Sequence, residues 1–187
     1  MFLEFLKQPR KVGAFCSSSK ALSVAMTHNL NIQNAKCIAE IGPGLGSFTN
    51  EIIRLKDKNS TFIAIEINKN FYNILYDKFG QTPNVYIENQ NANNINNIIK
   101  SKNIENLDIV ISGIPWTILK PKDKITLLSN INESLKKGGV FSTFMYALPT
   151  PQAKSFRKIL HKKFSKVKVS KIIWKNFPPA IIFYCKK

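Results

Sequence analysis

Acidic residues are scarce in this sequence: 11 Asp and Glu stand against 28 Lys and Arg, which gives a formal net charge of +17 at pH 7. None follows Glu133, so the last part of the chain is uniformly basic. A charge of this sign attracts polyanions, either nucleic acid or an anionic membrane surface. Lysine far outnumbers arginine, the residue that base recognition usually recruits. Lysine-rich faces in contact with solvent therefore explain part of the positive charge as well as a polyanionic partner does.

Cysteine motifs and long apolar runs are also missing. Cys16, Cys37 and Cys185 are scattered and match no metal or redox spacing, which predicts no metal site and fits a reducing cytosol. No apolar run approaches the ~20 residues that span a bilayer, and the start, Met1 to Lys7, is too short and too charged for a signal peptide. We therefore expect a cytoplasmic monomer that meets a membrane only peripherally, at its inner face.

The feature around which the chain is organised is a glycine turn. An apolar run from Cys37 reaches Glu40 and Ile41, and glycines then recur at positions 42, 44 and 46 before a segment that opens a helix. Such glycines let the backbone turn tightly and let a ligand lie close against it, where helix N-terminal amides point at that ligand. A tight strand-to-helix turn without a ligand is the simpler alternative.

A second acid strengthens the ligand interpretation. The apolar stretch from Thr61 ends in Glu66, roughly 20 residues past the glycine turn, where nucleotide-binding α/β units place a carboxylate on the ribose hydroxyls. An ordinary solvated Glu at a strand end is the alternative. Together, the glycine turn and the acid favour an adenosine-type ligand.

Strand and helix patterns alternate along the chain. Strands are expected at 36–41, 61–66, 84–88, 107–112, 140–145, 167–174 and 180–185, and helices at 20–30, 46–55, 70–79, 122–136 and 152–164. This alternation predicts an α/β fold: a Rossmann-like, seven-stranded, mainly parallel sheet with helices on both faces. The last two strands have no helix between them and should form an antiparallel hairpin. The Asn-rich stretch 88–106 is the nearest to low complexity, and coding bias or a loop tolerant of left-handed backbone explains it as well as function does.

The first 33 residues are expected to form a helical arm and a lid over the ligand site, and residues 34–187 a single domain. The apolar-rich segment Met1 to Gln8 either folds on an anionic membrane surface or packs on the core. Ser17, Ser18 and Ser19 are most simply helix caps. They are also candidates for hydrogen bonds to a ligand at the mouth of the site.

This order of elements, with the run Glu40 to Gly46, Glu66 and the turn Leu135 to Gly139, resembles the class I S-adenosylmethionine-dependent methyltransferases. The resemblance covers nearly the whole chain and implies S-adenosylmethionine as cofactor. The residues that it implies for cofactor binding are Glu40, Gly42, Gly44, Gly46, Glu66, Asn91, Ala92, Ser112 and Gly113. The reaction it implies is in-line transfer of a sulfonium methyl to a neutral amine, with Tyr146 as the candidate that stabilises or accepts the amine proton.

A narrower likeness covers the flanks of the site. The segments that carry it are Gly13 to Phe15 with Ser18 and Ser19, Ser112 to Pro115, Tyr146 before Pro149 and Pro151, and Asn176 to Ala180. They resemble the bacterial phospholipid N-methyltransferases, which methylate phosphatidylethanolamine towards phosphatidylcholine. The likeness implies a phospholipid acceptor near Ser18, Ser19, Pro115 and Trp116, and an anionic membrane surface as partner. Trp116, Trp174 and Phe177 are candidates for contacts with lipid chains, and burial in the core is the simpler expectation for all three.

The related rRNA adenine dimethyltransferases are the main alternative, and they make nucleic acid the competing partner. Those enzymes normally carry Asn-x-Pro-aromatic after the fourth strand and an extra helical domain at the C-terminus. This chain has Ser112-Gly113 at that position and ends after the hairpin, and both differences favour the lipid hypothesis. A degenerate fold that binds cofactor or membrane without turnover is the third hypothesis.

Three departures from the resembled pattern concern the site itself. Asn91 stands where an acid usually holds the adenine amino group, Ser17 stands where the family pattern has proline, and Ala147 stands where a glycine follows the fifth-strand tyrosine. The amide oxygen of Asn91 can still accept a hydrogen bond, without a charge. We therefore expect weaker or altered cofactor contacts.

Overall fold

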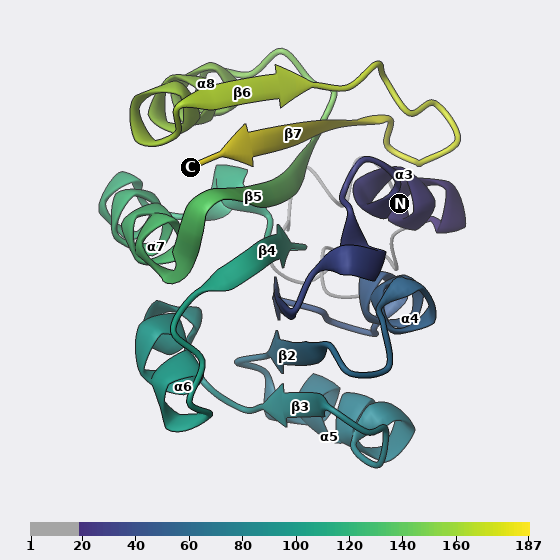
Figure 1. The fold of residues 1–187 in the computed structure, drawn as a ribbon. Coiled ribbons are helices and arrows are strands. Elements are labelled where there is room, and N and C mark those ends of the chain that lie inside the picture. The colour runs from purple at the N-terminus through teal and green to yellow at the C-terminus, as the bar shows by residue number, and fades with distance from the viewer. Residues whose placement is uncertain (1–18) are drawn as a thin grey trace.

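A seven-stranded sheet forms the centre of the computed structural model, which describes residues 19–187 (Figure 1). The strand order is β3-β2-β1-β4-β5-β7-β6. Its parallel members are β1 (Cys37–Ile41), β2 (Thr61–Ile65), β3 (Val85–Glu88), β4 (Leu107–Ser112) and β5 (Leu135–Tyr146). β7 (Ala180–Lys186) runs antiparallel to both β5 and β6 (Lys166–Val169). The predicted fold class and the closing hairpin are confirmed.

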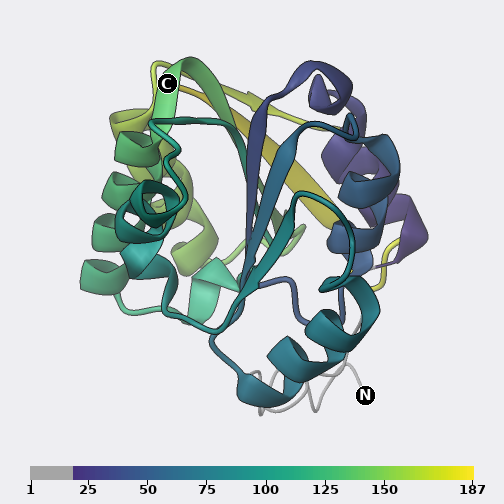
Figure 2. The same cartoon turned by 60° about the horizontal axis from the view of Figure 1, so that its bottom comes forward.

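Helices cover both faces of this sheet (Figure 2). α3 (Lys20–His28), α4 (Ser47–Leu55) and α5 (Lys69–Phe79) lie on one face. α6 (Ile95–Ser101), α7 (Pro121–Ser134) and α8 (Pro151–Lys163) lie on the other. Three short 3₁₀ turns, η1 (Ile32–Asn34), η2 (Ala92–Asn94) and η3 (Trp116–Ile118), complete the elements of the described residues.

Two apolar clusters hold the helices to the sheet. Because successive side chains of a strand point to opposite faces, Ile38 of β1 packs with the α3 side, while Ala39 packs with the α7 side. Leu22 and Met26 bring α3 into the first of these clusters and are fully buried. α3 is thus packed on the core through its apolar face.

The Asn-rich stretch contains a helix that the sequence analysis did not predict. Residues 95–101 form helix α6, whose Ile95, Ile98 and Ile99 are buried against the sheet. These three positions have helical spacing, so the burial of one apolar face outweighs the poor helix propensity of the surrounding asparagines.

Strand β5 already begins at Leu135, so the segment Leu135 to Gly139, expected as a turn, belongs to the strand. The remaining differences lie near the C-terminus. β6 ends at Val169 instead of continuing to Trp174. The expectation that the large aromatics are buried is correct for Trp116, which is 1% exposed, and wrong for Trp174 and Phe177, which are 74% and 66% exposed.

Predictions on residues 1–18, including the segment Met1 to Gln8 and Ser17 and Ser18, lie outside the described residues, as does the first part of the arm and lid expected over residues 1–33. Within residues 19–187, no helix combines the length and the apolar character that crossing a bilayer requires.

Candidate active site

The glycine turn joins β1 to α4 at the carboxyl edge of the sheet. Gly42, Gly44 and Gly46 all have positive φ angles, +67°, +57° and +82°, which side chains disfavour. A Cβ on Gly42 would lie 2.9 Å from Cγ1 of Ile114, whereas a Cβ on Gly44 would meet nothing within 4 Å. The turn is therefore closely packed against the β4 side at Gly42 and open at Gly44.

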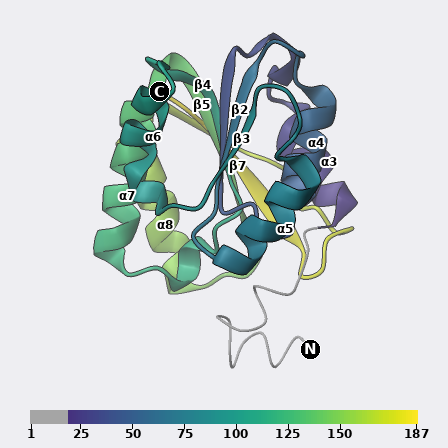
Figure 3. The same cartoon turned by 90° about the horizontal axis from the view of Figure 1, so that it is seen from below.

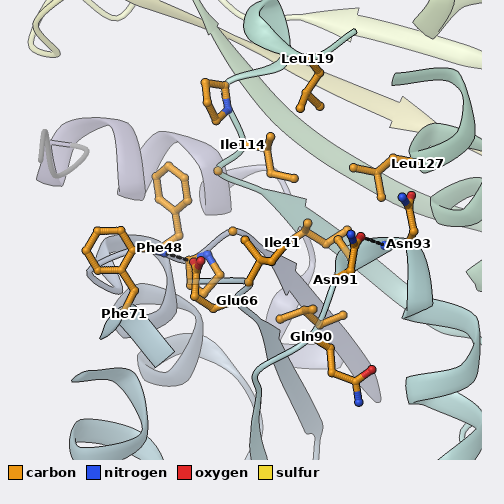
Figure 4. Close-up of a pocket in the computed structure, with 18 of the residues that line it drawn as sticks. Ile41, Phe48, Glu66, Phe71, Gln90, Asn91, Asn93, Ile114, Leu119 and Leu127 are labelled. Carbon is orange, nitrogen blue, oxygen red and sulfur yellow. Dashed lines mark hydrogen bonds between the residues drawn. The ribbon is translucent and has the colours of Figure 1, made fainter. Parts of the chain in front are cut away.

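Glu66 follows β2 and fixes this turn. Its Oε2 accepts a hydrogen bond from the backbone N–H of Gly44 at 3.0 Å (Figure 4). Its Oε1 accepts one from the N–H of Asn68 at 2.8 Å. The side chain is buried, so its carboxylate is held in one position by two backbone donors.

A cavity of about 600 Å³ opens beside Glu66. Its lining comes from the glycine turn, from the segments after β2 and β3, from the segment after β4 and from the start of α7 (Figure 4). The predicted cofactor residues that line it are Gly42, Gly44, Glu66, Asn91, Ala92 and Gly113. A volume of this size suits a ligand as large as a nucleoside derivative.

Glu40 lies in β1, outside the cavity lining, and is fully buried. Its Oε2 accepts a hydrogen bond from Oγ1 of Thr49 at 2.7 Å, while its Oε1 has no hydrogen-bond partner. Burial raises the pKa of Glu40 to about 8, against the smaller lowering by the Thr49 hydrogen bond, and the neighbouring charge of Glu66 raises it further. Burial thus favours the protonated form of this carboxyl group.

Asn91 and Ala92 begin the η2 turn at the far end of the cavity. Oδ1 of Asn91 accepts a hydrogen bond from the N–H of Asn93 at 2.9 Å, which caps the turn (Figure 4). Because an amide oxygen has two lone pairs, it keeps one acceptor site for a ligand.

The segment after β4 forms the opposite wall. Ser112 is buried, and its Oγ accepts a hydrogen bond from the N–H of Ile114 at 3.3 Å. A Cβ on Gly113 would lie only 2.7 Å from the carbonyl oxygen of Gly42, so the two backbone segments are in direct contact. Pro115 lines the cavity.

Trp116 points away from this wall into the core. Its Nε1 donates a hydrogen bond to Oγ1 of Thr143 at 2.8 Å, and its ring stacks on Phe156 with centroids 5.0 Å apart. Ser112 and Gly46 likewise do not line the cavity.

The remaining predicted residues lie elsewhere. Tyr146 is the last residue of β5 and pairs with Ala180; its ring packs edge-on to Phe144, and it is not part of the cavity lining. Ser19 caps α3, since its Oγ accepts a hydrogen bond from the N–H of Leu22 at 3.1 Å.

Sequence reasoning missed the residues that close the cavity on the α7 side. Ile114, Ile118, Leu119 and Leu127 give this wall an apolar surface, and Asp123, in the first turn of α7, adds a carboxylate. The Pro121 start of the helix marks this place in the sequence, but no motif indicates that the helix end faces a ligand.

The charges around the cavity contrast with those of the whole chain. Glu66 and Asp123 are the ionisable residues in its lining, and no lysine or arginine of residues 19–187 belongs to it. Within the same described range, no group of three or more His, Cys, Asp and Glu side chains is arranged to hold a metal ion.

A sequence model described as "Ribosomal RNA adenine dimethylase" matches residues 14–136, about two thirds of the chain. The chain belongs to this family. The family relationship and the cavity together make the chain an S-adenosylmethionine-dependent methyltransferase, as the sequence resemblance predicted.

Two relatives of the chain have named activities, and these activities differ in the molecule that is methylated. The chain is 22% identical over 184 residues to an ornithine lipid N-methyltransferase of Singulisphaera acidiphila, which covers 98% of this chain and 92% of that protein. It is 27% identical over 181 residues to ribosomal RNA small subunit methyltransferase A of Borreliella burgdorferi, where the match covers 92% of this chain but 60% of the relative. The chain thus spans less than two thirds of the length of this rRNA enzyme.

Solved structures show the same fold. The fibrillarin of Aeropyrum pernix, with natively bound S-adenosyl-L-methionine, superposes with a TM-score of 0.69 at 13% identity, over 92% of this chain and 76% of that chain. An S-adenosylmethionine-dependent O-methyltransferase of Thermotoga maritima gives 0.66 at 18% identity, over 88% and 64%.

The described residues fit S-adenosylmethionine. The open space at Gly44, the fixed carboxylate of Glu66 and the amide oxygen of Asn91 are features that suit a nucleoside ligand in this cavity. When bound, this cofactor supplies an activated methyl group. The chain's own part is to bind, orient and shield the reactants.

Proposed function

We propose that this protein methylates the amine headgroup of an amino lipid, phosphatidylethanolamine or a related lipid such as ornithine lipid, at a membrane surface. The observation that carries the proposal is the chemistry of the cavity wall formed by the segment after β4 and the start of α7. This wall is apolar, has no side-chain amide at Gly113, and carries one carboxylate, Asp123.

Gly113 supports a lipid acceptor over adenine. In the sequence Gly113-Ile114-Pro115-Trp116, glycine stands where the resembled rRNA enzymes carry the asparagine of Asn-x-Pro-aromatic. The 2.7 Å approach to the Gly42 carbonyl oxygen leaves no room for any side chain there. A planar base amine would therefore lack a side-chain amide partner from this position.

The charges of the cavity support an ammonium headgroup. A lipid amine has a pKa near that of lysine, about 10, so it arrives as a cation and must lose a proton before transfer. Asp123 attracts such a cation at the cavity wall, and the described lining holds no lysine or arginine that would repel it. The same acids would repel the phosphates of an RNA strand from the cavity itself.

Tyr146 keeps its proposed part as the group that stabilises or accepts the amine proton. It ends β5 at the same sheet edge as the cavity. A proton relay would have to connect it to the cavity, since it is not part of the lining.

RNA is the second candidate acceptor. The family's description and the net charge of +17 favour it, because phosphate binding draws on lysines in the same way as an anionic bilayer does. An RNA acceptor predicts that the protein transfers methyl groups to RNA and that the rate of this transfer falls steeply as the salt concentration rises.

One labelling experiment separates these functions. The purified protein is incubated with methyl-labelled S-adenosylmethionine and a total cell extract, and the lipid, RNA and protein fractions are then counted separately. Label in lipid supports the proposal, whereas label confined to RNA or protein refutes it. Cofactor binding without label in any fraction would identify the chain as a binding protein without turnover.

A matched variant sharpens the result. Asp123→Asn removes the negative charge at the wall where the acceptor is proposed to bind, but leaves Glu66 and the glycine turn intact. Under the lipid proposal it lowers labelling of lipid, and under the RNA hypothesis it leaves labelling of RNA equal or higher.

A further inference from the structure

We propose that the loop 170–179, which joins β6 to β7, is the element that docks this protein on an anionic bilayer. In this proposal, Trp174 and Phe177 enter the headgroup region of the membrane. It rests on the proposed lipid function, because it names the surface through which the enzyme would reach a membrane-bound acceptor.

The loop exposes several large apolar side chains to solvent. Trp174 is 74% exposed, Phe177 66% and Ile172 42%. Apart from Ile67 in the cavity lining, Trp174 and Phe177 are the most exposed large hydrophobic residues of the described chain. Clustered exposed apolar residues mark interaction sites, and tryptophan in particular prefers the membrane–water interface.

The charge of the loop complements anionic lipids. Lys171 and Lys175 flank Trp174 and are exposed. Because no acidic residue follows Glu133, nothing within this part of the chain offsets them. Basic residues beside apolar ones are the combination that binds an interface rich in acidic headgroups.

The loop is held in a defined shape. Asn176 is buried, and its Nδ2 donates a hydrogen bond to the carbonyl oxygen of Pro178 at 2.7 Å, while its Oδ1 accepts one from the N–H of Ser19 at 3.1 Å. At the start of the loop, Oγ of Ser170 accepts a hydrogen bond from the N–H of Ile182 at 2.9 Å. A loop that is already ordered loses little conformational entropy on docking.

The loop lies at the same edge of the sheet as the cavity. Ala180, the first residue of β7, pairs with Tyr146, the last residue of β5, so the loop leaves the sheet at the carboxyl ends of the parallel strands. Figure 3 shows the loop at this edge and the C-terminus at the opposite one. A bilayer in contact with the loop therefore faces the side on which the cavity opens.

Aromatic and basic residues together can also stack on the bases of single-stranded RNA. Two observations favour the bilayer. Ile172 has no ring to stack, and the loop's cations are lysines, which lack the planar stacking surface of arginine. Binding of RNA through the loop is an outcome that the experiment distinguishes.

The test uses the fluorescence of Trp174. The vesicles contain phosphatidylglycerol and phosphatidylcholine with brominated acyl chains, so they offer an anionic surface but no primary amine. Of the two tryptophans in the chain, Trp116 is buried in the core and stays out of reach of the bromines. We expect vesicles to quench the wild-type fluorescence, and Trp174→Phe to lose the quenchable part.

Binding measurements complete the test. Trp174→Ser with Phe177→Ser should weaken vesicle binding by about tenfold or more, and each Lys→Gln at 171 and 175 by roughly fivefold. The controls are Tyr76→Ser on α5 and Lys58→Gln in the turn before β2, two exposed residues whose loss should leave binding unchanged. Thermal unfolding and cofactor affinity, equal to wild type, verify that each variant folds.

Each outcome decides the proposal. Vesicle binding that is unaffected by the loop substitutions, or that occurs without quenching, overturns it. Loss of RNA binding in the loop variants with unchanged vesicle binding assigns the loop to stacking instead. Because the vesicles carry no acceptor, docking is measured independently of methyl transfer. Label confined to RNA in the extract experiment would refute the proposed function while the docking result is still read separately.

Discussion

Replacing Gly113 by alanine is the most direct test of the cavity wall. The new Cβ would lie 2.7 Å from the carbonyl oxygen of Gly42 and 3.5 Å from Cε2 of Phe48. Hydrogen bonds hold both backbone segments in place. The N–H of Gly42 donates to the carbonyl oxygen of Ile65, and the N–H of Gly113 donates to the carbonyl oxygen of Ile41. The substitution therefore has to displace a main-chain segment that lines the cavity.

The magnitude follows from this contact. Overpacking of a closely packed site costs about 1–3 kcal/mol, which corresponds to a fall in Tm of roughly 2–12 °C for a chain of this size. Because the wall itself moves, we also expect the Kd for S-adenosylmethionine to rise by about tenfold, or 1.4 kcal/mol. Differential scanning fluorimetry measures the first effect and isothermal titration calorimetry the second.

Gly138→Ala is the matched control. Gly138 also needs a glycine, with φ at +78°, but a Cβ there would meet only Cε of Lys186 at 3.6 Å. It should lower stability by about 1–2 kcal/mol through backbone strain alone and leave cofactor affinity unchanged. If Gly113→Ala had the stability and the S-adenosylmethionine affinity of the wild type, the close approach of the Gly42 and Gly113 segments would be refuted.

Three further predictions concern the carboxyl groups. Glu66→Gln keeps the shape but turns an amide nitrogen towards a backbone donor, so calorimetry should show cofactor affinity reduced by roughly tenfold or more; an equal affinity would contradict the role of the charge. Glu40 has a native pKa of about 8 against an ordinary 4.5, so the native state binds more protons and wild-type stability should fall as pH rises between these values. Tm against pH should be flatter in Glu40→Gln, and parallel curves would count against the buried proton. Asp123→Asn should raise KM for the proposed amino-lipid acceptor by roughly two- to fivefold with cofactor Kd unchanged; an unchanged KM would show that Asp123 takes no part in binding that acceptor.

The elements that are local in sequence could be predicted. The glycine turn and Glu66 follow apolar strands, and parallel strands bring their carboxyl ends to one edge, so their convergence on one cavity follows from the pattern alone. Asp123 could not be placed in the same way. Its position depends on how α7 packs across the sheet, which is a tertiary contact that no local pattern encodes.

The two tryptophans illustrate the same limit. Trp174 follows alternating lysine and valine and then two isoleucines, so the sequence predicts a strand that continues through it. In the structure, the hydroxyl of Ser170 takes the hydrogen bond of the Ile182 N–H, and the regular strand has already ended at Val169. Ile173 still forms a bridge with Ala180 of β7, but Trp174 after it is exposed, whereas Trp116 enters the core.

The reversed direction of β7 has a consequence for how such a chain can diversify. A parallel strand in this place would need a helical crossover, whereas an antiparallel one needs only a loop, and that loop emerges at the edge of the sheet where the cavity opens. Its tip can lengthen, shorten or change composition without altering the register of any strand. Substitutions in the roughly ten residues of the loop 170–179 can therefore give the same cofactor-binding core a new binding surface. Recognition sequences can be grafted at the same position by protein engineering.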